Sequence, residues 1–332
     1  IYLTYYYREK KLTISKIKRK TMKENIKSGA IMDIYDARDY QWSEIGKASA
    51  PFNWKEGFDI EDKLGFKIPV KSQGGSLSCG GQSFAYYAQV LEALNTKTFE
   101  ERSAKFLYSQ CWCPEGGSRG RDICKIIKAQ GSAKEAFLPS YYQDKTPLSE
   151  EDYRDTSSIN NVIRQDAKST LALSYANVNP DIDSIAQAIR DNNGCVIGVT
   201  GENNGTWYSE FPKPPTKNSW NHWVYACKAK LIKGKKYIGI INSWGEECGN
   251  KGIQWIGEDY FSAYTDYPAI WQAWTLILTK TDEKRNLLQT LLLAVLSKIK
   301  NYDRSNRNIN KCNSWIYSFS GISINTNSKK LC

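Results

Sequence analysis

Apolar residues recur with helical spacing in three stretches of the chain. In residues 79–95 they fall at i, i+3, i+4 and i+7, which predicts a helix with one buried face. The residues on that face are Phe84, Tyr87, Ala88 and Leu91. The same spacing predicts helices over residues 121–130 and 181–193, and each is followed by a glycine that would end it.

After residue 194 the pattern changes to short β-branched and aromatic runs separated by turns, which predicts strands. The predicted strands cover residues 195–200, 222–227, 237–242, 252–256 and 273–278. The stretch 201–219, rich in Gly, Asn and Pro, is expected to be a loop. Helices that come first and strands that come later are typical of an α+β fold with two segregated lobes.

The ends of the chain differ from its middle in charge. The net charge of +11 over 332 residues comes from residues 1–21, with seven Lys/Arg and one acid, and residues 281–332, with nine and three. We therefore expect a polar, basic N-terminal extension over residues 1–35, a domain over 36–280 and a basic C-terminal extension over 281–332. Clustered charge alone does not recognise nucleic-acid bases specifically, so no specific nucleic-acid partner is expected.

No segment has the pattern of a membrane span or a secretory signal. The longest apolar run, residues 287–296, has about half the length of a span and suits an amphipathic surface helix. The aromatic start of the chain becomes charged too early for a signal peptide. This pattern favours an intracellular location, with the reservation that a chain beginning at Ile1 is compatible with a fragment.

Nine cysteines and one histidine limit the metal chemistry. None of the cysteine spacings matches a two-pair zinc site, so neither a metal nor an organic cofactor is expected. The odd number leaves at least one cysteine unpaired if the others form disulfides.

The one histidine, His222, opens an apolar strand after a long loop. A lone histidine is more often structural than catalytic, but strand ends present side chains to clefts. Asn242 ends the next predicted strand, and its carboxamide would accept the imidazole Nδ1–H and leave Nε2 facing a nucleophile. The alternative is that Asn242 is an ordinary turn residue.

Cys79 is the candidate nucleophile because it lies where a Gly/Ser-rich turn becomes a helix. The N–H groups of a helix N-terminus stabilise a thiolate. Six residues earlier, Gln73 can donate to an oxyanion together with the backbone N–H of Cys79. The alternative is that Cys79 is a small buried hydrophobic residue.

These motifs resemble those of the papain-like cysteine peptidase family. The run VKSQGGSLSCGGQSFA is similar to the family segment that carries the oxyanion glutamine and the nucleophile, which places them on Gln73 and Cys79. The run NHWVYAC places the catalytic histidine on His222, and INSWGEECGNKGIQWI places the orienting asparagine on Asn242.

The resemblance covers roughly residues 36–280 and implies the fold of that family. A helical lobe over about 60–165 would carry the nucleophile helix, and an antiparallel β-barrel-like lobe over about 166–280 would face it across a cleft. The resemblance also makes Trp244 the indole that shields Asn242, and a contact for the substrate. Within PEGGSRGRDICKII, it makes Gly117 a contact for the backbone of a bound peptide.

Four positions depart from the family pattern. Gly80 follows the nucleophile where the family has tryptophan, and Ser76 replaces a disulfide-forming cysteine. Cys248 replaces a second tryptophan. Trp223 follows the histidine where a small residue is usual, and there it either borders the pocket for the second substrate residue or packs into the core.

The reaction that the resemblance implies is hydrolysis of peptide bonds in polypeptide substrates, through an acyl-enzyme on cysteine. Two alternatives stay open. One is a non-catalytic peptide-binding homologue, and the other is a different amidase or acyltransferase with a Cys-His-polar site. The sequence leaves the oligomeric state undefined.

Overall fold

A computed structural model describes residues 29–45, 50–168 and 174–277. The chain divides into two compact units, residues 1–278 and 279–332. The second unit, with the helix predicted over residues 287–296, lies outside the described residues, and so does most of the predicted N-terminal extension. The fold below is that of the first unit.

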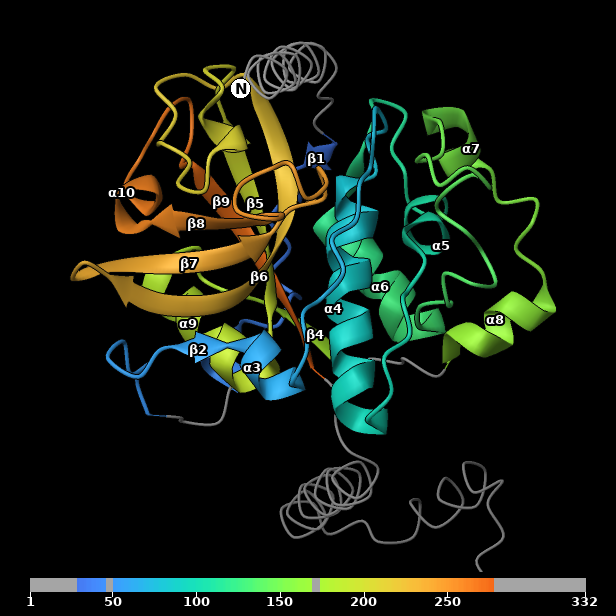
Figure 1. The fold of residues 1–332 in the computed structure, drawn as a ribbon, viewed down its shortest axis with the longest axis horizontal. Helices are drawn as coiled ribbons and strands as arrows, with labels where there is room; N and C mark the ends of the chain where they lie inside the picture. Colours follow the sequence, from blue (N-terminus) through green and yellow to red (C-terminus); the bar gives the residue numbers. More distant parts are fainter. Residues whose placement is uncertain (1–28, 46–49, 169–173, 278–332) are drawn as a thin grey trace, which may run out of the picture. The chain divides into compact units, whose positions relative to one another are not determined.

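Helix α4 (Cys79–Thr96) is the central helix of this unit, and its first fifteen residues are all buried. It ends where Lys97 takes the left-handed conformation and donates its backbone N–H to the carbonyl of Ala93. Figure 1 shows α4 between the strands and a group of shorter helices. That group comprises α5 (Ala104–Tyr108), α6 (Gly120–Gln130), α7 (Glu150–Arg154) and α8 (Asn161–Ala167).

The strands form a seven-stranded sheet in the order β4-β9-β5-β6-β7-β8, with β2 added on β6, and its described pairs are antiparallel. The strands are β2 (Phe58–Asp59), β4 (Ser174–Asn177), β5 (Cys195–Gly201), β6 (Trp220–Ile232), β7 (Lys235–Ile241), β8 (Ile253–Gly257) and β9 (Ile270–Ile277). The remaining helices are α2 (Trp42–Ile45), α3 (Ile60–Leu64), α9 (Ile182–Asn192), α10 (Glu258–Phe261) and the 3-10 turn η2 (Thr206–Tyr208).

Two hydrophobic clusters define two lobes. One surrounds α4 and its neighbouring helices, and the other lies between the sheet and α9. The lobes join where α4 packs on β6, since the Ser83 hydroxyl donates to the Trp223 carbonyl over 2.8 Å. The predicted α+β fold with two lobes is confirmed.

The three predicted helices are confirmed as α4, α6 and α9, and Gly131 caps the C-terminus of α6. Strand β6 is longer than expected, because the predicted run 222–227 extends to Trp220 and to Ile232. Inside the stretch expected to be a polar lead-in, β1 (Ala30–Ile31) pairs in parallel with β3 (Ser118–Arg119).

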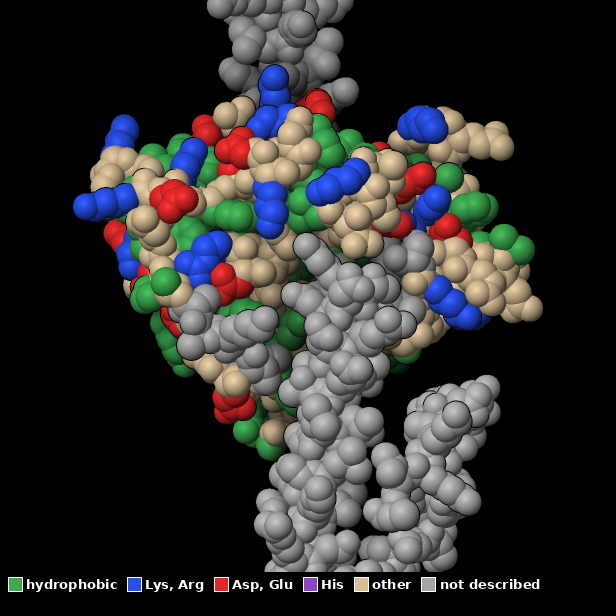
Figure 2. Space-filling view, turned by 90° about the horizontal axis from the view of Figure 1, so that it is seen from below, with side chains coloured by type: hydrophobic (Ala, Val, Ile, Leu, Met, Phe, Trp, Pro, Cys, Tyr) green, Lys and Arg blue, Asp and Glu red, His purple; other side chains and the backbone are tan. Residues whose placement is uncertain are grey.

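The described part of the chain has no helix long and apolar enough to cross a membrane. On the face shown in Figure 2, the basic and acidic side chains of the described residues are interspersed. That face therefore carries no large patch of one sign.

Candidate active site

Cys79 is the first residue of α4 and is fully buried. Its thiol accepts hydrogen bonds from the backbone N–H groups of Trp223, Gly29 and Gly80. Burial nevertheless raises the pKa of the thiol to about 11, since the three donors offset only part of the desolvation. In this conformation the group is a neutral thiol.

His222 lies in β6 and is also fully buried. Its Nε2 atom is 2.9 Å from Oδ1 of Asn242. Because a carbonyl oxygen only accepts, this contact places the imidazole proton on Nε2. Burial lowers the pKa of the imidazole to about 4, although the bond to Asn242 opposes that shift.

The expected pairing of Nδ1 with Asn242 was therefore wrong, because the ring has the opposite orientation. Nδ1 of His222 is buried and has no hydrogen-bond partner among the residues that the structure describes. A buried nitrogen of this kind requires an explanation. Since the next residue, Trp223, donates its backbone N–H to Cys79, the thiol lies close to the histidine backbone.

Asn242 follows β7 directly, and its side chain is engaged at both ends. Oδ1 faces His222, and Nδ2 donates to Oε1 of Gln254 over 2.7 Å. The structure thus gives the Asn242 side chain the orienting contact rather than a turn contact.

Three indoles enclose His222 on one side. The ring of Trp244, which the resemblance made the shield of Asn242, lies 4.7 Å from the imidazole at an interplanar angle of 32°. Trp207 and Trp220 approach the imidazole edge-on. Neither was singled out from the sequence, because residues 201–219 looked like an ordinary loop and Trp220 precedes the recognised motif.

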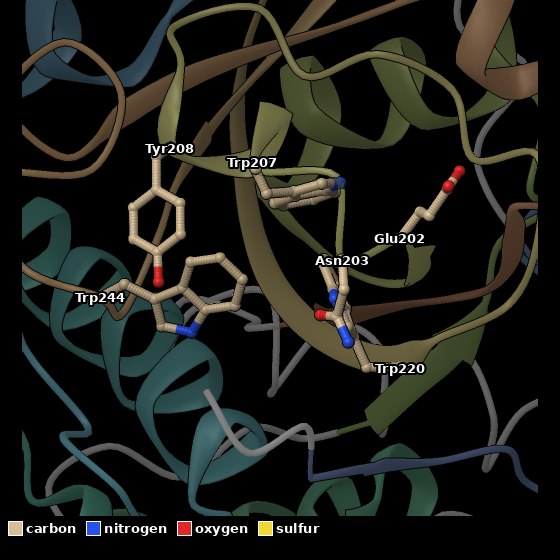
Figure 3. A pocket seen from close by; sticks show the side chains of 7 residues that line it. Glu202, Asn203, Trp207, Tyr208, Trp220 and Trp244 are labelled. Atoms are coloured by element: carbon tan, nitrogen blue, oxygen red, sulfur yellow. The ribbon is translucent and has the colours of Figure 1, made fainter. Parts of the chain in front are cut away.

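These indoles border a small hollow of about 50 Å³ beside the histidine (Figure 3). Its lining residues are Glu202, Asn203, Gly205, Trp207, Tyr208, Trp220 and Trp244. Trp244, which was expected to contact the substrate, is one of these lining residues.

Gln73 is tied to the segment that carries Asn242. Its Oε1 accepts from the Ser243 hydroxyl over 2.7 Å, and its backbone N–H donates to the Ser243 carbonyl over 2.8 Å. Its Nε2 donates to the Ser76 carbonyl over 2.8 Å, in the turn that leads to Cys79. The amide nitrogen of Gln73 is thereby directed toward the start of α4.

Ser76 stabilises that turn with hydrogen bonds where the resembling family has a disulfide. Its hydroxyl donates to the Gln73 carbonyl over 2.7 Å and lies 2.8 Å from the Ser78 hydroxyl. All seven cysteines in the described ranges are free thiols.

The Trp223 indole packs close to Gly80. It is fully buried, packs edge-on against Trp271 at 4.7 Å and donates Nε1–H to the Ser118 carbonyl over 3.0 Å. A Cβ added to Gly80 would lie 2.4 Å from Ser118 Oγ, 2.8 Å from Ile123 Cδ1 and 3.2 Å from Trp223 Cδ1. Ser118, Ile123 and Trp223 together occupy the space that a side chain at position 80 would need.

The prediction that Trp223 contacts the substrate was therefore wrong. Its side chain packs into the core, as the alternative expected. Successive side chains of a strand point to opposite faces of the sheet. His222 is directed toward Asn242, so Trp223 is directed into the core between β6 and α6.

The chain's own residue Gly29 occupies the place expected for a bound peptide. The Ser118 N–H donates to the Gly29 carbonyl over 2.8 Å. A Cβ on Gly117 would lie 2.0 Å from the Gly29 oxygen, and a Cβ on Gly29 would lie 1.9 Å from the Leu77 oxygen. The backbones are in direct contact, and residues 29–31 help to bury the thiol of Cys79.

Asp33 anchors this segment to the body. Its Oδ2 accepts from the Arg121 backbone N–H over 3.1 Å and from Trp274 Nε1 over 3.0 Å. Its own N–H donates to Oε1 of Gln272 over 3.1 Å, and the Arg121 side chain forms an ion pair with Asp39. Burial raises the pKa of Asp33 to about 6 despite these donors.

Within the described residues, no group of three or more His, Cys, Asp and Glu side chains could hold a metal ion.

The described fold is similar to those of solved cysteine proteases. Xylellain, a cysteine protease from Xylella fastidiosa, matches with 22% identity over 76% of this chain and 96% of its own, at a TM-score of 0.60. Digestive procathepsin L 3 of Tenebrio molitor larval midgut matches with 17% identity over 78% of this chain and 79% of its own, at a TM-score of 0.58. The bromelain protease of Ananas comosus, in complex with the E64 inhibitor, matches with 22% identity over 67% of this chain and 99% of its own, at a TM-score of 0.52.

The chain therefore has the papain-like fold, and its structural neighbours are papain-like cysteine proteases. A scan against models of protein families and a search of curated proteins gave no match. At these identities the likeness defines the fold, so the activity has to be argued from the site.

Proposed function

We propose that the protein is a cysteine peptidase that hydrolyses peptide bonds, with Cys79 as nucleophile, His222 as base and Asn242 as the residue that orients it. The observation that carries this proposal is the buried Nδ1 of His222, which has no partner among the described residues while Nε2 is held by Asn242. A base that receives the thiol proton requires this arrangement.

The reaction starts when residues 29–31 leave the cleft and a peptide enters. The Cys79 proton moves to Nδ1 of His222, and the thiolate attacks the carbonyl carbon. The Cys79 N–H and Nε2 of Gln73 donate to the oxyanion. His222 then protonates the leaving amine, which departs and leaves an acyl-enzyme. Water, deprotonated by His222, hydrolyses the thioester and restores the thiol.

The closed conformation disfavours the ion pair that this mechanism needs. Burial raises the pKa of Cys79 to about 11 and lowers that of His222 to about 4, so both groups are neutral near pH 7. Displacement of residues 29–31 admits water and peptide, and the ion pair becomes accessible. The protein is thus expected to be latent until that segment moves.

A non-catalytic peptide-binding protein is the second candidate. It is favoured by the complete burial of Cys79 and by the chain's own segment at Gly117. Under that reading, the segment is a resident ligand and no substrate is turned over.

The test uses the Gly29→Ala chain, in which the added Cβ would lie 1.9 Å from the Leu77 carbonyl oxygen and displace residues 29–31. Labelling of this chain with an irreversible thiol reagent, in parallel with turnover of fluorogenic peptide amides, separates the candidates. A peptidase loses turnover in proportion to labelling, and the label maps to Cys79. Protection of Cys79 by a peptide, without any turnover, supports the binding protein. Transfer of the acyl group to an added amine in preference to water identifies an acyltransferase.

A further inference from the structure

Gln254, in β8, holds the end of the Asn242 carboxamide that His222 does not use. Its Oε1 accepts from Nδ2 of Asn242 over 2.7 Å. Its Nε2 donates to two backbone carbonyls, those of Trp207 at 2.7 Å and Ser209 at 3.1 Å. Gln254 and Asn242 are both fully buried.

The two backbone carbonyls determine the orientation of both amides. A carbonyl oxygen only accepts, so Gln254 has to direct its NH₂ group at Trp207 and Ser209 and its oxygen at Asn242. Asn242 then has to direct Nδ2 at Gln254 and Oδ1 at His222. A carbonyl oxygen facing the ring stabilises the tautomer protonated at Nε2 and leaves Nδ1 free to receive a proton.

Cys248 completes the same arrangement. Its Sγ lies 3.5 Å from Nδ2 of Asn242, and its thiol donates to the Trp207 carbonyl over 3.1 Å. The resembling family has a tryptophan at this position, so the smaller cysteine offers Asn242 polar partners where an indole would cover it. Trp207 contributes its carbonyl to Gln254 and Cys248 and its ring to the wall beside His222.

We propose that Gln254 is a positioning residue for the hydrolytic reaction, which acts through Asn242 to hold His222 in the tautomer that accepts the Cys79 proton. This role rests on the proposed function. It explains why a glutamine interrupts the apolar run of β8, where every neighbouring side chain is apolar.

The Gln254→Met variant removes this control while it keeps a long, unbranched side chain. The Asn242 carboxamide then loses the oxygen acceptor that fixes its nitrogen and keeps only the weakly accepting Cys248 sulfur at 3.5 Å, so it can turn its NH₂ group toward the ring. An NH₂ group facing the ring needs an unprotonated Nε2, so the proton moves to Nδ1 and the base is lost.

Nitrogen-15 NMR of the imidazole in the full chain tests this directly. His222 is the only histidine, so its signals need no assignment. The wild type is expected to show protonated Nε2 and unprotonated Nδ1. Gln254→Met is expected to lose the Nε2–H signal and gain an Nδ1–H signal. Gln89→Met, a matched change of a fully buried glutamine in α4, is expected to leave the spectrum unchanged.

An unchanged imidazole spectrum in folded Gln254→Met would overturn the proposal. If that variant does not fold, Gln254→Glu carries the test, because it keeps the shape and an acceptor facing Nδ2. It is expected to retain the Nε2–H tautomer, and an inverted tautomer in it would equally contradict the role.

Kinetics then separate this inference from the proposed function. Gln254→Met is expected to lower kcat/KM about tenfold, the effect of one lost hydrogen bond, and to have no further effect in an Asn242→Ala background. A Gly29→Ala chain, in which the added Cβ would lie 1.9 Å from the Leu77 carbonyl oxygen and displace residues 29–31, would refute the peptidase if Cys79 is alkylated and no peptide amide is hydrolysed. The imidazole spectrum would still test Gln254 in that case. An active chain in which the two losses add independently would refute the positioning role alone.

Discussion

Nε2 of His222 lies 2.9 Å from Oδ1 of Asn242, and this contact determines which ring nitrogen is left for the nucleophile. The contact lies under the Trp244 ring and away from solvent, where a hydrogen bond between neutral groups is not exchanged for water. The roles of the two residues differ accordingly, since His222 transfers protons and Asn242 orients the ring.

We therefore expect Asn242→Ala to lower kcat/KM by roughly 10- to 100-fold, and His222→Ala to lower it further, to the level of background hydrolysis. Turnover of fluorogenic dipeptide amides measures both losses, and circular dichroism checks that the variants fold. Equal losses, or a larger loss for Asn242→Ala, would contradict the assigned roles.

Gly29→Ala is expected to open the cleft. The added Cβ would lie 1.9 Å from the Leu77 carbonyl oxygen, which belongs to the backbone and cannot turn away. An overlap of this kind costs about 1–3 kcal/mol, so the thiol should become alkylated about tenfold faster or more. The matched control is Gly75→Ala, because a Cβ on Gly75 has nothing within 4 Å. Equal alkylation rates in both variants would show that Gly29 does not seal the site.

Asp33 should make docking of residues 29–39 depend on pH. Burial raises its pKa in the folded state from an ordinary 3.8 to about 6, so the folded state binds the proton more tightly than the unfolded state. Stability contributed by Asp33 is therefore fully present below about pH 4 and is lost as pH rises to about 6.

The free energy of unfolding, compared between wild type and Asp33→Asn from pH 4 to 7, measures this contribution. Over that range the wild type should lose about 2.4 kcal/mol more stability than the variant, because one pKa unit corresponds to about 1.4 kcal/mol and part of the contribution is already lost at pH 4. Parallel pH profiles would show that Asp33 is not buried as a neutral acid.

Trp223→Ala should destabilise the protein by about 3–5 kcal/mol, because it removes a fully buried indole and its bond to the Ser118 carbonyl. Preference for the second substrate side chain should stay the same. Trp112→Ala, at an indole that is 37% exposed, should cost less and provides the control. Better turnover of bulky substrates without loss of stability would show that Trp223 borders the substrate pocket.

The sequence predicts the parts of this site that depend on local pattern. The i, i+3, i+4 spacing predicted α4. The motifs predicted His222 and Asn242 as partners, and the structure joins these two directly. The sequence left two positions open for the Trp223 side chain, the pocket and the core. Its burial against Trp271 involves residues far apart in the chain, so local pattern could not decide between them.

Other features depend on contacts between distant segments, and local pattern does not encode them. The orientation of the imidazole is set by Asn242 twenty residues later, and Gly29 reaches Gly117 only because the folded chain brings them together. Gln254 is recognisable in the sequence as a single polar residue in an apolar strand. Its role could be inferred only from its hydrogen bond with Asn242 in the folded chain.

The role of Cys79 as nucleophile is tested by turnover of a fluorogenic peptide amide by the Gly29→Ala chain with and without Cys79→Ala. We expect Cys79→Ala to abolish turnover in a folded protein, whereas Cys124→Ala, at another buried free thiol, retains it. More than a trace of hydrolysis by the folded Cys79→Ala protein would show that another group is the nucleophile.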